Sequence, residues 1–135
     1  MFSHFSPAAQ ALVHLAEQEC RNASHYYLGT EHLLLAMAIA PADDIASYFR
    51  DAGIEPWQVK RSVRSLMGPP AEHPWDGVVI TPRVLRIFGS ATAAAQQRGA
   101  FVEPLDVLHG IIDDGRGIAA SALARLASET PRTRA

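Results

Sequence analysis

The sequence contains one stretch of about 45 residues twice, and this duplication restricts the fold more than any other feature. Ser6-Pro7 places a capping hydroxyl before a proline at the first helical position, and Thr81-Pro82 repeats that arrangement 75 residues later. The apolar positions of the helix that follows keep this offset, and after the next loop, which is one residue shorter in the second copy, the offset is 74, as in Leu28 and Val102. Because a repeat of this kind buries its apolar face against its twin, the sequence predicts one domain and not two independent ones.

Helical spacing of apolar residues runs through both copies. In the first copy it predicts helices over about 7–22, 30–40, 42–51 and 56–66, and in the second a helix over 82–97 followed by further helix to about 126. We therefore expect an all-α fold of two pseudo-symmetric repeats of about four helices each, packed into one compact domain. The second repeat is truncated, because it has no counterpart of the helix at 56–66.

Residues 1–135 divide around a segment rich in proline and glycine. Repeat 1 covers about 5–67, a linker 68–79, repeat 2 about 80–127, and a polar tail 128–135. The net charge of −2 and the interspersed charges argue against nucleic acid or an anionic membrane as partner. No apolar run reaches the roughly 18 residues of a membrane span, and the lone Cys20 agrees with a reducing compartment, so we expect a cytoplasmic protein.

The motifs of common catalytic and metal sites are absent from the sequence. There is no phosphate-binding loop, no HExxH, no paired-cysteine zinc pattern and no GxSxG elbow, so we expect no catalytic residue, no cofactor and no metal. A metal site at His25, Glu31 and His32 is disfavoured because Glu31 and His32 point about 100° apart on a helix. The acidic pairs Asp43-Asp44 and Asp113-Asp114 are expected at or just before helix starts, where negative charge is favourable.

Three stretches resemble a known family: FSPAAQALVHLAEQECRNASHYYLGTEHLLLAM, IASYFRDAGIEPWQVKRSV and ITPRVLRIFGSA. They are similar to the Clp repeat domain at the N-terminus of ClpC-type and ClpA/ClpB-type AAA+ unfoldases, over about residues 2–127. In that family the domain receives substrates and adaptor proteins. The resemblance implies a non-enzymatic, stand-alone binding module that acts as an adaptor or a decoy for Clp partners. The alternative is the excised N-terminal domain of a complete ClpC-type ATPase.

In the ClpC branch, the Thr and Glu of the GTEH segment resemble a receptor for phosphorylated arginine. Here they are Thr30 and Glu31. A threonine at a helix N-cap beside unpaired N–H groups suits a phosphate, and a glutamate suits a guanidinium. The alternative is that both residues only stabilise the helix start. In the second copy Glu103, Pro104 and Leu105 replace Gly29, Thr30 and Glu31, which removes a donor and the carboxylate and adds a charge that repels phosphate.

A second surface is also implied by the resemblance. In actinobacterial relatives an aromatic residue near the chain start and residues after the linker receive antibacterial cyclic peptides. The corresponding residues here are Phe2, Ile80 and Leu85, an apolar set without a second aromatic or a cation. A further alternative function is that the chain sequesters such peptides. In the opposite case, Phe2 only fills a hydrophobic gap in the domain and binds no ligand. We expect a monomer, with a dimer through the truncated second copy left open.

Overall fold

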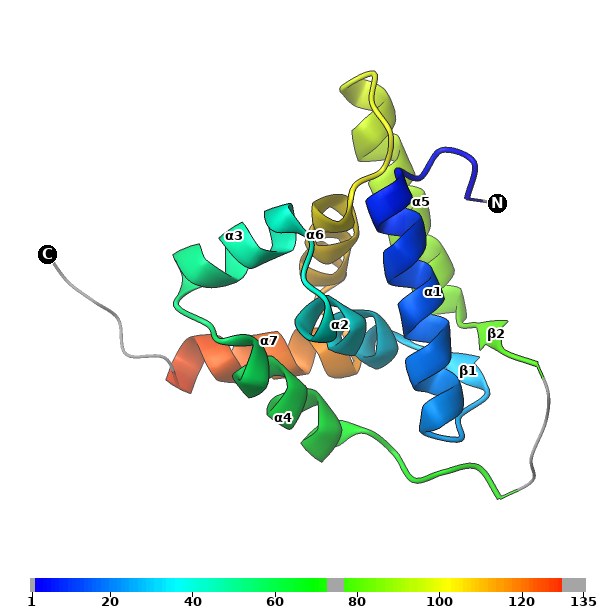
Figure 1. Ribbon diagram of the computed structural model, residues 1–135, viewed down its shortest axis with the longest axis vertical. Coiled ribbons are helices and arrows are strands. Elements are labelled where there is room, and N and C mark those ends of the chain that lie inside the picture. Colours follow the sequence, from blue (N-terminus) through cyan, green and yellow to red (C-terminus); the bar gives the residue numbers. More distant parts are fainter. Residues whose placement is uncertain (1, 73–76, 130–135) are drawn as a thin grey trace, which may run out of the picture.

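The first copy folds into four helices and the second into three, within residues 2–72 and 77–129, which are those that the computed structural model describes (Figure 1). The fold is all-α, as the sequence predicts. The elements of the first copy are α1 Pro7–Asn22, β1 Tyr27–Leu28, α2 Thr30–Ile39, α3 Asp43–Ala52 and α4 Pro56–Leu66. Those of the second copy are β2 Val79–Ile80, α5 Pro82–Gln97, α6 Pro104–Asp114 and α7 Gly117–Glu129.

The two repeated cap signals work as the sequence predicts. The Ser6 hydroxyl accepts a hydrogen bond from the Ala9 N–H at 3.1 Å, and the Thr81 hydroxyl accepts one from the Val84 N–H at 3.2 Å. Each bond satisfies a backbone donor that the first turn of a helix leaves unpaired, which stabilises the helix by about 1 kcal/mol. α1 and α5 therefore begin at equivalent residues of the two copies.

The two copies exchange backbone hydrogen bonds, which the sequence analysis missed. β1 and β2 pair in parallel, and the Thr81 N–H donates to the Leu28 carbonyl at 3.2 Å. The equivalent bond in the other direction runs from the Ser6 N–H to the Val102 carbonyl at 2.9 Å. The segment before the first helix of each copy is thus paired with the segment before the second helix of the other copy. Part of the predicted linker, at Val79, belongs to this pairing.

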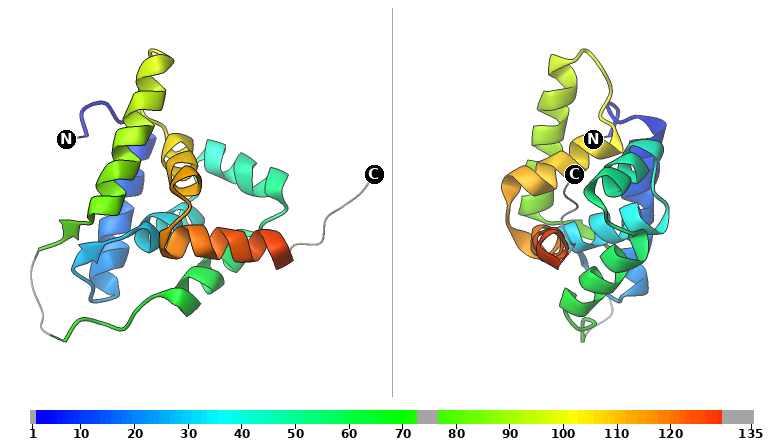
Figure 2. Two further views of the ribbon diagram at one scale, coloured as in Figure 1. Left: turned by 180° about the vertical axis from the view of Figure 1, so that it is seen from behind. Right: turned by 90° about the vertical axis from the view of Figure 1, so that its left-hand side faces the viewer.

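The two copies differ in how completely their second helix is covered. Leu35 and Ala38 of α2 are 2% and 3% exposed, because α4 packs against α2 and α7. The equivalent residues of α6 are His109, which is exposed, and Ile112, which is 38% exposed. Within the described residues no helix packs on α6 in the way that α4 packs on α2 (Figure 2). The described part of the second copy therefore has no counterpart of α4.

One expectation about helix starts is wrong. Asp43 and Asp44 do open α3, but Asp113 and Asp114 are the last two residues of α6. The helix ends there because Gly115 adopts a left-handed conformation with φ of 69°. Negative charge at a helix C-terminus is unfavourable, and the ion pair between Arg83 Nε and Asp114 Oδ2 at 3.2 Å offsets part of that effect.

Candidate functional site

The strongest candidate site is a cavity of about 430 Å³ where three helices begin. α2, α5 and α7 all direct their N-termini toward it, and its lining includes Thr30, Glu31, Thr81, Arg83 and Gly117. The first turn of each helix carries N–H groups without partners in the helix and the positive end of the helix dipole. Convergence of three such ends makes this region attractive to an anion. We refer to it as the helix-start cavity.

Thr30 is placed one residue differently from the sequence prediction. The N-cap of α2 is Gly29, so Thr30 is the first residue of the helix and not its cap. Its side chain is buried, and its Oγ1 accepts a hydrogen bond from the Ala119 N–H in the first turn of α7 at 3.3 Å. The Thr30 hydroxyl therefore ties α2 to α7 and still has its own proton to donate.

Glu31 is half-buried, and its carboxylate folds back over Gly29. A Cβ added to Gly29 would lie on the Glu31 Oε1 atom. The absence of a side chain at residue 29 therefore gives the carboxylate its position at the mouth of the helix-start cavity. A carboxylate held there is a partner for a guanidinium, as the sequence suggested for this residue type.

Three further lining residues escaped the sequence analysis: Thr81, Arg83 and Arg86, from the start of α5. The Arg83 guanidinium lies against the start of α7. A Cβ atom added to Gly117 would be 3.3 Å from the Arg83 Nη1 atom. Arg86 adds positive charge to the three helix starts, and Arg83, which is paired with Asp114, adds further N–H donors. The repeated Ser-Pro and Thr-Pro signals mark Thr81 as a helix cap, but only the exchanged backbone pairing brings it to the other copy's Glu31.

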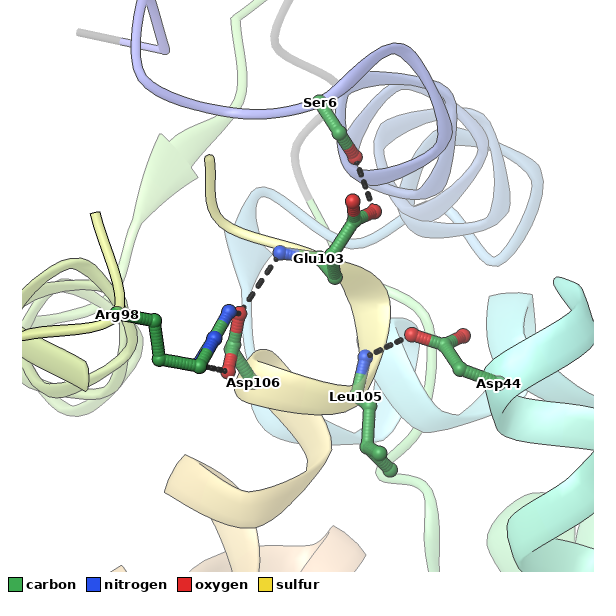
Figure 3. A network of polar contacts seen from close by, with 6 residues as sticks. All are labelled: Ser6, Asp44, Arg98, Glu103, Leu105 and Asp106. Carbon is green, nitrogen blue, oxygen red and sulfur yellow. Dashed lines mark hydrogen bonds and ion pairs between the residues drawn. The ribbon is translucent and has the colours of Figure 1, made fainter. Parts of the chain in front are cut away.

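In the corresponding region at the start of α6, carboxylates from both copies occupy the positions around the helix start (Figure 3). Glu103 stands where Gly29 does, and its Oε1 accepts a hydrogen bond from the Ser6 hydroxyl at 2.6 Å. The Leu105 N–H, in the first turn of α6, donates to Asp44 Oδ2 at 3.0 Å. The space and one donor that an anion would need are thus already taken by two carboxylates of the protein.

Asp106 also lies at this helix start. It accepts two hydrogen bonds from the Arg98 guanidinium, at 2.7 and 2.8 Å, and one from the Glu103 N–H at 2.9 Å (Figure 3). Burial alone would raise the pKa of Asp106, but the hydrogen bonds from Arg98 and Glu103 outweigh it and lower that pKa below its usual range. Asp106 is therefore a carboxylate at neutral pH, and its negative charge at the start of α6 disfavours a second anion.

His25, in the loop before β1, and His32, on α2, are in contact. The Gly29 N–H donates to His32 Nδ1 at 3.0 Å, so the proton of His32 is on Nε2, which donates to His25 Nδ1 at 2.9 Å. The His25 Nε2 then donates to the Gly68 carbonyl at 3.0 Å. This histidine chain links the start of α2 to the linker. Among the described residues no three His, Cys, Asp or Glu side chains are grouped to hold a metal ion.

Of the three residues of the second predicted surface, Leu85 lies in α5, Ile80 ends β2 just before α5, and Phe2 contacts α5 through Phe88. Phe2 packs edge-on against the rings of Phe5 and Phe88, with centroid distances of 5.1 and 5.7 Å. Leu85, one helical turn before Phe88, is 45% exposed, and Ile80 at the end of β2 is half-buried. Phe2 thus contributes to the core at this end of the molecule, and Leu85 is the most exposed of the three.

Comparison with known families matches residues 4–126 to the Clp repeat N-terminal domain. The chaperone protein ClpB of Oceanobacillus iheyensis is 28% identical over 127 residues, which are 93% of this chain and 16% of that protein. The negative regulator of genetic competence ClpC/MecB of Bacillus subtilis is 29% identical over 127 residues, with the same shares. The chain spans 16% of the length of these relatives.

Solved structures support the same fold. The N-domain of ClpV from Vibrio cholerae superposes with a TM-score of 0.71 at 15% identity, over 98% of this chain and 90% of that one. A ClpV N-domain in complex with a VipB peptide gives a TM-score of 0.76 at 14% identity, over 96% and 81% of the two chains. In the described part of the present chain, no helix is long and apolar enough to cross a membrane.

Proposed function

The chain belongs to the Clp repeat N-terminal domain family, and from this premise we propose that it is a binding module of the Clp proteolysis system that recognises proteins carrying phosphorylated arginine. Peptide binding by a domain of this fold has support in the ClpV N-domain, whose structure includes a VipB peptide. The observation that carries the proposal is the composition of the helix-start cavity. It combines several groups that attract an anion with one carboxylate at its mouth.

Phosphoarginine has the two charges that this combination suits. Its phosphate is attracted to the starts of α2, α5 and α7 and to the guanidinium groups of Arg83 and Arg86. Its own guanidinium, bonded directly to the phosphate, requires a carboxylate nearby, and Glu31 supplies one. A simple phosphate uses only the first set of groups and free arginine only the second. The cavity therefore favours the ligand that carries both charges.

Only the first repeat keeps this chemistry in our proposal. At the start of α6, Glu103 fills the position of Gly29, Asp44 accepts a hydrogen bond from the Leu105 N–H, and Asp106 stands where the first repeat has the neutral His32. Three carboxylates around that helix start repel an anion. We therefore expect each chain to bind one phosphoarginine.

The biological role we propose is delivery or retention of marked proteins. An adaptor speeds the degradation of a phosphoarginine-marked protein by a ClpC-type unfoldase and its protease, whereas a decoy slows it. Adding the purified chain to such a reaction distinguishes the two roles. No change at any concentration would contradict both.

Titration calorimetry with free phosphoarginine tests the ligand. We expect saturable binding near one equivalent, and we expect Glu31→Gln to weaken it by about tenfold or more, because a charged hydrogen bond contributes about 1.5–3 kcal/mol. Glu31→Gln is preferred to a change at Thr30, because the buried Thr30 hydroxyl also holds α7. The exposed Glu72 in the linker provides the matched control, Glu72→Gln, which removes the same charge outside the helix-start cavity.

Free arginine and inorganic phosphate complete the experiment, and each is expected to bind more weakly than phosphoarginine. Arg83→Gln should weaken phosphate and phosphoarginine alike. Equal binding of phosphoarginine by Glu31→Gln and wild type would reduce Glu31 to a residue that stabilises the helix start, and no heat in either protein would remove phosphoarginine as the ligand.

A further inference from the structure

A second cavity, of about 410 Å³, lies between α4 and α7. Its lining includes Trp57 and Arg61 from α4 and Arg125 and Leu126 from α7. α7 contributes to both cavities, since Gly117 at its start lines the helix-start cavity. Eight residues separate Gly117 from Arg125, which corresponds to about 12 Å along the helix. The α4–α7 cavity is therefore a separate site, and neither the duplication nor the proposed function accounts for it.

The charge of the α4–α7 cavity is positive. Arg61 and Arg125 line it, and no acidic residue does. The ion pairs among the side chains that the structure describes are Arg83–Asp114 and Arg98–Asp106, so neither Arg61 nor Arg125 has a carboxylate partner among them. Two guanidinium groups facing one cavity in a chain of net charge −2 form a local concentration of positive charge. A ligand that carries a carboxylate would pair with them.

Trp57 gives the same cavity an apolar wall. It is the second residue of α4, and 57% of its surface is exposed. Exposure of a tryptophan leaves a large apolar area in water, and such residues are enriched where proteins bind one another. Leu126, from α7, is nearly buried and closes the cavity from the other helix. The cavity thus presents an aromatic face beside its two cations.

The Ser62 side chain supplies an independent sign of an absent partner. Ser62 lies on α4, lines the cavity and is only 7% exposed, yet within the described residues its hydroxyl has no hydrogen-bond partner. A buried hydroxyl without a partner is unfavourable, and most such groups in proteins are satisfied. An acceptor entering the cavity would remove this penalty. A carboxylate oxygen or a peptide carbonyl meets that requirement.

We propose that the α4–α7 cavity binds an acidic peptide segment in which a carboxylate neighbours an aromatic side chain. The carboxylate pairs with Arg61 and Arg125, the aromatic ring packs on Trp57, and the Ser62 hydroxyl donates to an oxygen of the peptide. A peptide is favoured over a bare anion because Trp57 and Leu126 give the cavity an apolar wall. The site is independent of the phosphoarginine proposal, since it shares no residue with the helix-start cavity.

The test is a titration of the isotope-labelled chain with the capped tetrapeptide Asp-Phe-Glu-Phe, followed by two-dimensional nuclear magnetic resonance. Saturable shifts are expected for the indole N–H of Trp57 and for the backbone N–H groups of Ser62 and Arg125. We expect Arg61→Gln, Arg125→Gln and Trp57→Ala each to weaken binding by about tenfold. Arg50→Gln, which removes an exposed arginine on α3, is the matched control and should leave binding unchanged.

Two further probes decide the chemistry. The neutral tetrapeptide Asn-Phe-Gln-Phe should bind at least about tenfold more weakly than the acidic one. Inorganic phosphate should produce no saturable shift at Trp57. Equal binding of the two peptides, shifts of the same size with phosphate alone, or shifts confined to other helices would each overturn the proposal.

The two cavities are separated by crossed variants. Glu31→Gln should leave binding of the acidic peptide unchanged, and Trp57→Ala should leave phosphoarginine binding unchanged. If Trp57→Ala abolishes both, the variant has lost its fold, and Trp57→Phe, which keeps a ring, then replaces it. Failure of one ligand alone therefore refutes only the proposal for its own cavity.

Discussion

Lowering the pH from 6.5 to 4 will reduce the free energy of unfolding by about 3 kcal/mol through His32 alone. Burial, and to a smaller extent the neighbouring His25, lower the pKa of His32 from 6.5 to about 4. The unfolded chain therefore binds a proton in this range that the folded chain does not. The contribution of neutral His32 to the free energy of unfolding is complete above pH 6.5, falls as the pH drops, and is lost near pH 4. Each unit by which the pKa is lowered corresponds to 1.36 kcal/mol.

The histidine chain explains why His32 stays neutral. Its Nδ1 already accepts the Gly29 N–H, and its Nε2 proton is donated to His25, so an added proton breaks one of these bonds. His25 is the titratable group in direct contact, and its own Nε2 is committed to the Gly68 carbonyl. Protonation of His32 at Nδ1 thus removes the acceptor of the Gly29 N–H at the start of α2.

Urea unfolding at pH 7, 5.5 and 4 measures this effect. His32→Asn places an amide oxygen near the position of Nδ1 but does not titrate. Between pH 7 and pH 4 the free energy of unfolding of this variant is therefore expected to fall by about 3 kcal/mol less than that of wild type. It should be less stable than wild type at pH 7, because the bond to His25 is lost. His14→Asn, at an exposed residue of α1, is the control. Identical pH dependence of His32→Asn and wild type would show that His32 titrates normally.

Replacing Gly110 by alanine will destabilise the protein by about 1–3 kcal/mol, although alanine is the better helix former. Gly110 lies where α6 crosses α5, and a Cβ there would be 2.9 Å from Ile87 Cγ2 and 3.2 Å from the Ile87 carbonyl oxygen. Ile87 is 1% exposed and has no free space to move into. The two helices must separate to admit one methyl group.

Gly89→Ala is the matched control for Gly110→Ala. Gly89 lies in α5, and a Cβ there would meet nothing within 4 Å. The same substitution should stabilise the protein by about 0.5–1 kcal/mol through helix propensity. Thermal unfolding of both variants compares the two effects directly. A stabilised Gly110→Ala would mean that α5 and α6 separate without cost.

Much of the fold was predictable because its signals are local. A capping hydroxyl followed by proline marks the start of α1 and α5, and Gly53 ends α3 in a left-handed conformation, as expected of that residue. The end of α6 was mispredicted because Gly115, its terminating residue, was not recognised, so Asp113 and Asp114 were assigned to a helix start. The strands of two residues each are too short to give an alternating pattern.

The candidate site was less predictable because its residues come from distant parts of the chain. Thr30 and Glu31 form a local motif, but nothing in the local sequence places Arg83 beside them. That proximity depends on the exchange of backbone bonds between the copies. The α4–α7 cavity has the same origin, since Arg61 and Arg125 approach each other only when α4 packs on α7.

The exchanged pairing between the copies has a consequence for how such a chain arose. Two separate chains, each with a single repeat, would make the same contacts across a two-fold axis: Thr81 N–H to Leu28 in one direction and Ser6 N–H to Val102 in the other. The architecture is therefore that of a symmetric homodimer whose subunits have been joined end to end. Fusion releases the two halves from identity. In this chain the two halves differ at the equivalent helix starts, where one half has Glu103 and the other has Gly29.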